Sequence, residues 1–174
     1  MIPLALTAIT ATSCIGRGLQ QTLAALQTQR SGLAPCQFET VDIATCIGEV
    51  AGVDAVVLPE ALRDFDCRNN RLAHLGLRQD DFATAVQTAV ARWGRRRVGV
   101  FIGTSTSGIL QTEIAYRHRD PQTGALPADF HYPGTQNLYS AADFVRRSAG
   151  VLGPAVVISC ACSSSAKVFA SAAR

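Results

Sequence analysis

Residues 154–169 read PAVVISCACSSSAKVF, and this segment carries the clearest signal of secondary structure in the chain. The apolar run 155–159 follows a Gly-Pro pair and is typical of a buried strand. Small and polar residues come next, and helical character continues over 166–174. The stretch therefore predicts a strand, a sharp turn and a helix, with Cys162 on the turn.

A cysteine on such a turn is placed for nucleophilic chemistry. Ligand crevices in open α/β sheets lie at the carboxyl ends of strands, and a helix N-terminus lowers the pKa of a thiol such as that of Cys162. Unsatisfied backbone N–H groups at the turn, including that of Cys162, are suited to an oxyanion. The alternative is a buried cysteine that fills space. We expect Cys160 to pack inside, with a reactive pair as its alternative.

Strand-like and helical segments alternate along the rest of the chain. This alternation predicts an α/β protein with a mostly parallel sheet. An irregular excursion over 117–134 is rich in Asp, Pro and Gly. Strand-like runs cover 4–9, 41–50, 98–102 and 155–159, and helical spacing covers 19–29, 69–92, 109–116, 140–149 and 166–174.

Composition excludes several classes of protein. The chain has 174 residues, of which 48% are hydrophobic and 17% charged. A disordered chain needs low hydrophobicity and high net charge, so it is excluded. A charged share below the usual level of about 25% indicates surface that a partner or further chain covers.

Compartment and metal binding follow from similar observations. No apolar run is long enough to cross a membrane, and the first residues do not resemble a secretory signal. The six cysteines form no Cys-x-x-Cys pair, so we expect free thiols, no metal and no cofactor in a cytoplasmic protein.

Basic residues cluster at Arg92, Arg95, Arg96 and Arg97. The cluster is short and lacks interleaved aromatic residues, which argues against nucleic-acid binding. We expect a solvated turn between a helix and a strand. The alternative is electrostatic docking of an acidic partner.

The motif Ser-Cys-Ala-Cys-Ser-Ser-Ser at 159–165 resembles the active-site motif of the β-ketoacyl-acyl carrier protein synthases, usually Thr-Ala-Cys-Ser-Ser. These are the condensing enzymes of fatty acid and polyketide synthesis. Cys160 replaces the usual Thr, which is a departure. Residues 97–108, 150–154 and 30–32 also resemble family segments, as do 10–16, although the usual Pro is absent there.

The resemblance implies the N-terminal half of a thiolase-like fold, with a mostly parallel five-stranded sheet and helices on its faces. Residues 1–174 are then a β-ketoacyl synthase N-terminal domain, truncated within the helix after the nucleophile. The family dimerises through the strand beside the nucleophile, which maps near 155–159. We therefore expect a homodimer that binds acyl carrier protein and its acyl and malonyl thioesters.

The resemblance also assigns the site residues. Cys162 is the nucleophile, and Thr104, Ser105 and Ser107 are expected to bind substrate. The two family histidines that assist decarboxylation lie in the second half, so we expect this fragment alone to be inactive.

The remaining candidates receive ordinary roles. We expect His74 at the surface or an edge, His118 and His131 in solvated loops, and Lys167 in packing or a salt bridge. Residues 135–137 either approach the site or a partner subunit, or form only a turn before the next helix.

Three functions stay open. The first is a decarboxylative Claisen condensation through acyl-Cys162, which needs the C-terminal half. The second is a non-catalytic thiolase-half domain that dimerises or binds a carrier protein. The third is a thiolase-like or coenzyme A-dependent acyltransferase, which the two serines after Cys162 favour less.

Overall fold

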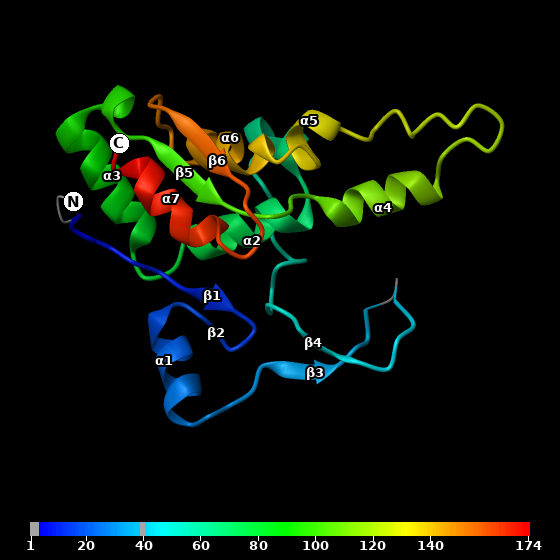
Figure 1. Ribbon diagram of the computed structural model, residues 1–174, viewed down its shortest axis with the longest axis horizontal. Coiled ribbons are helices and arrows are strands. Elements are labelled where there is room, and N and C mark those ends of the chain that lie inside the picture. The colour runs from blue at the N-terminus through cyan, green and yellow to red at the C-terminus, as the bar shows by residue number, and fades with distance from the viewer. Residues whose placement is uncertain (1–3, 39–40) are drawn as a thin grey trace.

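A parallel pair of strands organises the protein. The computed structural model describes residues 4–38 and 41–174. Strand β5 (Val100–Gly103) pairs with β6 (Ala155–Ile158), so that Val100 lies opposite Ala155 and Gly103 opposite Ile158. Figure 1 shows both strands between α6 (Tyr139–Ser148) behind them and α7 (Ser164–Ala172) in front.

The alternation of side chains along β5 assigns one helix to each face of the pair. Val100 is buried against Ala142 of α6 and against Val151. Gly103 points the other way, because a Cβ added there would lie 2.6 Å from the carbonyl oxygen of Ser164 in α7. Successive residues of a strand face opposite sides, so the two helices cover opposite faces.

Helix α6 also joins the second part of the core. Phe144 is fully buried and packs with Phe65, whose ring centroid lies 6.1 Å away. Leu58 and Leu62 complete this cluster. The remaining helical elements are α1 (Leu19–Gln27), η1 (Glu60–Phe65), α2 (Arg68–Leu77), α3 (Phe82–Trp93), η2 (Arg95–Arg97), α4 (Ile109–Arg117) and α5 (Tyr132–Thr135).

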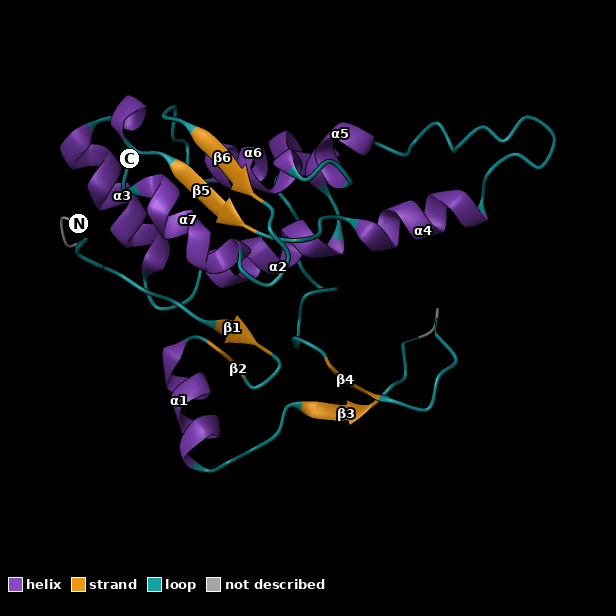
Figure 2. Ribbon diagram, viewed as in Figure 1, coloured by secondary structure: helices purple, strands orange, loops and turns teal. Residues whose placement is uncertain are grey.

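Residues 12–38 and 41–48 form a separate region below the strand pair (Figure 2). It contains two antiparallel pairs, β1 (Thr12–Ser13) with β2 (Gly16–Arg17) and β3 (Leu33–Pro35) with β4 (Cys46–Gly48). Asp80, between α2 and α3, accepts hydrogen bonds from the backbone N–H of Leu19 at 2.9 and 3.0 Å. It also accepts one from Thr10 Oγ1 at 2.8 Å, and thus ties the start of α1 to the main core.

The helices predicted from the sequence are confirmed with small shifts of their ends. The predicted helix 69–92 is two helices, α2 and α3, which separate at residues 78–81. The backbone turns there through left-handed conformations at Asp80 and Asp81, both with φ of 56°. Gly76 lies inside α2, although Gly disfavours helix interiors.

The sheet is smaller than the five-stranded one expected. Within residues 4–38 and 41–174, six strands form three two-stranded sheets, of which only β5–β6 is parallel. The predicted strand 4–9 has no ladder partner in the described chain, and Leu4, Leu6 and Ile9 are 55%, 70% and 57% exposed. The predicted strand 41–50 shortens to β4.

The arginine cluster forms the turn between α3 and β5, as one of its two interpretations predicts. Arg92 lies over the ring of Trp93, with 4.6 Å from its Cζ atom to the ring centroid. Arg95 Nε donates to the carbonyl oxygen of Gly150 at 2.5 Å, which ties this turn to the loop before β6.

No helix in the described part of the chain has the length and apolar character needed to cross a membrane. The described residues likewise contain no group of three or more His, Cys, Asp or Glu side chains suited to a metal ion.

The expectation that His74 lies at the surface or an edge is wrong. His74 is only 7% exposed, and its ring centroid lies 6.3 Å from that of Phe144. The position of His74 on α2 directs its imidazole toward η1 and α6. Burial, with a smaller contribution from the charge of Arg78, lowers the pKa of its imidazole.

Replacement of Gly103 by Ala tests the close packing of β5 on α7. The added Cβ would lie 2.6 Å from the Ser164 oxygen and 2.8 Å from Ser165 Cα, so backbone must move. We expect G103A to lower the free energy of unfolding by about 1–3 kcal/mol in urea titrations. Gly76→Ala is the control, since its Cβ would meet Thr12 Oγ1 at 3.6 Å, an ordinary contact. Equal urea midpoints for both variants would contradict the packing.

The buried His74 predicts acid sensitivity. Its pKa is lower in the folded state, so the unfolded chain takes up the proton first as the pH falls below about 6.5. Stability therefore falls below that pH and is unaffected by His74 above it. We expect His74→Gln to reduce the loss of unfolding free energy between about pH 7.5 and about pH 5.5. His118→Gln, at an exposed histidine, should leave that loss unchanged.

Candidate active site

Cys162 lies on the turn that connects β6 to α7 (Figure 1). Residues 159–163 make this connection, and Cys162 is exposed. The prediction of a strand, a sharp turn and a helix is therefore confirmed. In this chain the exposure of Cys162 argues against the alternative of a buried, space-filling cysteine.

The backbone reverses at the residue just before the nucleophile candidate. Ala161 has a φ of 47°, in the left-handed region that residues with a side chain rarely adopt. No sequence signal marks this strain, because Ala is not a residue favoured at such positions. The conformation turns the chain tightly enough for Cys162 to stand out at the end of β6.

Two serine hydroxyls stabilise this turn. Ser164, which is 3% exposed, donates to the carbonyl oxygen of Ala161 at 2.7 Å and accepts from the backbone N–H of Cys160 at 2.8 Å. Ser163 donates to the carbonyl oxygen of Cys160 at 2.8 Å. Ser163 occupies the N-cap position of α7, but its hydroxyl donates backward to the carbonyl oxygen of Cys160 and caps no helical N–H.

The expectation that Cys160 packs inside is wrong, because its side chain is exposed. Lys167 is also exposed and forms no ion pair within the described residues. A contrasting cysteine is Cys67, which is 1% exposed and whose thiol pKa is raised by burial. Such a thiol is suited to packing rather than to attack.

The three predicted substrate-binding residues lie in the loop after β5. The backbone N–H of Thr104 donates to the carbonyl oxygen of Ile158 at 3.1 Å, so this loop begins beside the start of the cysteine turn. The Thr104 hydroxyl donates to the carbonyl oxygen of Thr106 at 2.7 Å. Ser105 is exposed. Ser107 is buried, and its hydroxyl donates to the carbonyl oxygen of Gln136.

Residues 135–137 dock on this loop and form the turn before α6. The backbone N–H of Gly108 donates to the carbonyl oxygen of Thr135 at 2.9 Å, and Thr112 Oγ1 lies 2.6 Å from Gln136 Oε1. Asn137 accepts from the backbone N–H of Ser140 at 2.8 Å through its own carbonyl oxygen. Residues 135–137 therefore hold the 104–108 loop in place.

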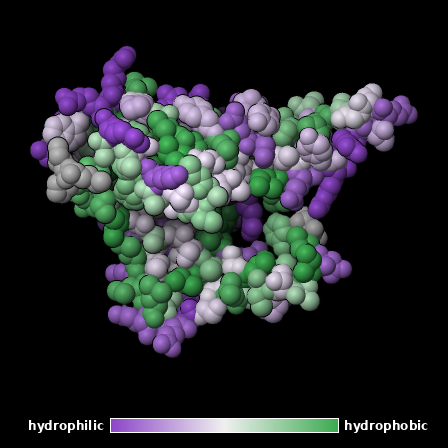
Figure 3. Space-filling view, in the orientation of Figure 1, coloured by the Kyte–Doolittle hydropathy of each residue, from purple (hydrophilic) through white to green (hydrophobic). Residues whose placement is uncertain are grey.

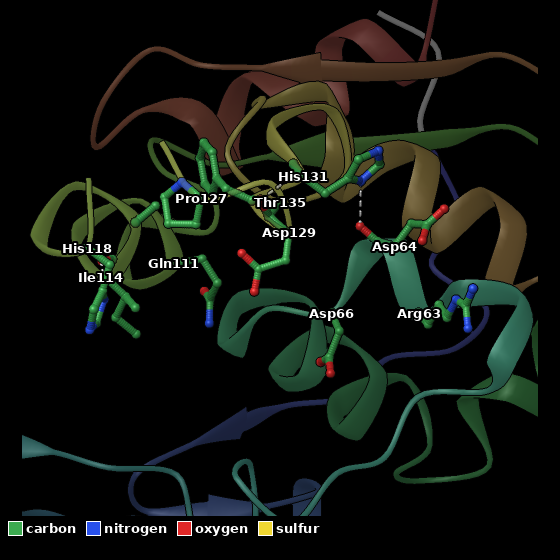
Figure 4. A pocket seen from close by; sticks show the side chains of 12 residues that line it. Arg63, Asp64, Asp66, Gln111, Ile114, His118, Pro127, Asp129, His131 and Thr135 are labelled. Atoms are coloured by element: carbon green, nitrogen blue, oxygen red, sulfur yellow. Dashed lines mark hydrogen bonds between the residues drawn. The ribbon is translucent and has the colours of Figure 1, made fainter. Parts of the chain in front are cut away.

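His118 and His131 line a cavity of about 700 Å³ between α4, α5 and the end of η1 (Figure 4). The Nδ1 atom of His118 lies 2.9 Å from the carbonyl oxygen of Ile114, and that of His131 lies 2.9 Å from the carbonyl oxygen of Asp64. Both side chains are exposed, as expected. Cys162 does not line this cavity, so the structure does not bring either histidine together with the thiol.

Comparisons with known proteins agree with this geometry. Residues 1–174 match the family model of the beta-ketoacyl synthase N-terminal domain. No curated protein matches the chain. Among solved structures the chain is similar to "Ketosynthase (ApeO) in Complex with its Chain Length Factor (ApeC)" from Xenorhabdus doucetiae, with 28% identity and a TM-score of 0.73.

The structural match covers 94% of this chain but 41% of the ketosynthase chain, so this chain spans about two fifths of that length. The match and the family model confirm the α/β, thiolase-like fold class that the resemblance implies. With its cysteine on the turn between a parallel strand and a helix, the chain belongs to the beta-ketoacyl synthase family, as an N-terminal domain.

Proposed function

We propose that the chain is the nucleophile-bearing half of a β-ketoacyl-acyl carrier protein synthase. The observation that carries the proposal is the exposed Cys162 on the turn from β6 to α7, in a chain of the condensing-enzyme family.

The reaction has two stages. The Cys162 thiolate attacks the carbonyl carbon of an acyl thioester, the bond to the carrier sulfur breaks, and the carrier thiolate leaves and takes up a proton. Malonyl-acyl carrier protein then loses carbon dioxide, and its carbanion attacks the carbonyl carbon of acyl-Cys162. The bond to Cys162 Sγ breaks, which regenerates the thiolate and releases the β-ketoacyl-acyl carrier protein.

Backbone and loop residues near the turn support the substrate. We propose that the N–H of Cys162 binds the oxyanion and that Thr104 and Ser105 line the acyl path. Ser107 holds the loop that carries these residues in place, because its hydroxyl donates a hydrogen bond to the carbonyl oxygen of Gln136.

The second half of the enzyme supplies the decarboxylation histidines and covers α7. The outer side of α7 is open in this chain, and its Phe169 is 53% exposed. Figure 3 shows hydrophobic residues, in green, on the surface of both the upper and the lower parts of this face. These exposed apolar residues support the inference that further protein packs here.

A pairing role is the second candidate function, and the edge of β6 favours it. Within the described residues β6 pairs only with β5, so its outer edge is open to another strand. The similar ketosynthase was solved in complex with its chain length factor. We propose that this edge pairs with a second ketosynthase-like chain, either as a homodimer or with a non-catalytic relative.

Replacement of Cys162 tests the catalytic proposal in the complete enzyme. Cys162→Ala should reduce acyl transfer from a radiolabelled acyl-carrier thioester to the protein by more than about 1,000-fold, because no thiolate remains to attack. Cys160→Ala is the matched control, since that thiol is exposed and only two positions away. Retained labelling of C162A would refute the assignment, whereas loss of labelling in both variants would point to disruption of the turn.

The strained turn gives a second test. Ala161→Val places a β-branched residue at a φ of 47° and should lower the free energy of unfolding by about 1–2 kcal/mol. Ala161→Gly should not lower it, because Gly adopts this conformation freely. Ala166→Val, in the first turn of α7, should cost only about 0.5 kcal/mol. Equal losses at positions 161 and 166 in urea titrations would contradict the strain.

A further inference from the structure

A second cavity, of about 530 Å³, lies on the side of the molecule that α6 covers. Its walls come from η1, α2, α3 and the end of α6, and none of its lining residues belongs to α7 or to the cysteine turn. The proposed condensation uses none of these residues.

A buried histidine without a hydrogen-bond partner lines this cavity. His74 is 7% exposed, and its imidazole forms no hydrogen bond with any residue in the ranges 4–38 and 41–174. Neither ring nitrogen of His74 is among the described side-chain atoms that are fully buried without a partner, so both keep some accessibility. His74 therefore offers a ring nitrogen to a ligand at the wall of this cavity.

The charged residues of the cavity are all basic. Arg147 is already held, because its Nε lies 2.9 Å from Asp143 Oδ2 and its Cζ lies 5.3 Å from the ring centroid of Phe65. Arg78 is exposed and forms no ion pair within the described chain. No Asp or Glu lines the cavity, so the charge of Arg78 is left for a ligand.

The rest of the wall is apolar and held in place. Leu77, Phe82 and Val86 form an apolar surface where α2 meets α3. Gln87 Nε2 donates to the carbonyl oxygen of Ala149 at 3.0 Å, which fastens α3 to the end of α6 across the cavity. A cavity of this size with few convergent polar groups is typical of small-molecule sites.

We propose that this cavity binds a small organic acid, with its carboxylate on Arg78 and His74 and its apolar body on Leu77, Phe82 and Val86. A planar guanidinium pairs with a carboxylate through two parallel hydrogen bonds, and the imidazole of His74 gains the partner it lacks. This site is separate from the cysteine turn and goes beyond the proposed condensation. Binding of the acid would be a second function, carried by η1, α2, α3 and α6.

Octanoate is a suitable probe, measured by isothermal titration calorimetry against the intact protein. We expect a single site with a dissociation constant below about 1 mM. Arg78→Gln removes the charge, and Ala83→Trp fills the cavity from an exposed position on α3. Each should weaken binding by about tenfold. Octanol, which keeps the chain and lacks the charge, should bind at least about tenfold more weakly than octanoate.

Matched variants separate this cavity from other sites. Ala91→Trp adds the same side chain to an exposed position of α3 that does not line the cavity, and Arg96→Gln removes a charge elsewhere. Both should leave the dissociation constant unchanged within about twofold. The proposal fails if octanoate does not bind, or if it binds equally well to R78Q and A83W, since it would then occupy another site such as the acyl path at Cys162.

Discussion

Strand β5 packs against the start of α7 with backbone facing backbone. The Cα atom of Gly103 faces the backbone of Ser164 and Ser165 without an intervening side chain. This contact sets how near α7 lies to the parallel pair, and hence how sharply residues 159–163 must turn. The left-handed backbone at Ala161 and the paired hydroxyl bonds of Ser164 follow from that short connection.

Much of the fold could be predicted from local patterns. The apolar runs of β5 and β6 and the helical spacing of α1, α4 and α6 are local signals of secondary structure, and these elements lie where the signals predict them. The run 4–9 has the same composition but no strand partner in the described chain, and composition cannot reveal a missing partner. His74 was misplaced because its burial depends on the distant Phe144.

The sequence predicts the chemistry of the site, but it does not predict the interactions that hold the cysteine turn in place. The motif around Cys162 indicates a nucleophile on a strand-to-helix turn, and the structure places the thiol there. These interactions are the hydrogen bonds donated by the Ser163 and Ser164 hydroxyls and the bond between Ser107 and Gln136. No local sequence pattern predicts them. Hydroxyl direction depends on which acceptors the tertiary structure brings near, so residue type alone does not determine it.

The parallel pairing of β5 with β6 has a consequence for the order of folding. Val100 and Ala155 pair although they are 55 positions apart, with three helices and an irregular loop between them. Contacts at such separation form slowly, because the loop entropy is lost before the contacts form. The turn that presents Cys162 is thus assembled late, and a nascent chain that has emerged only as far as α6 exposes β5 with an unpaired edge. Synthesis of this protein therefore passes through an interval in which β5 is complete and neither its partner strand β6 nor the thiol-bearing turn has been made.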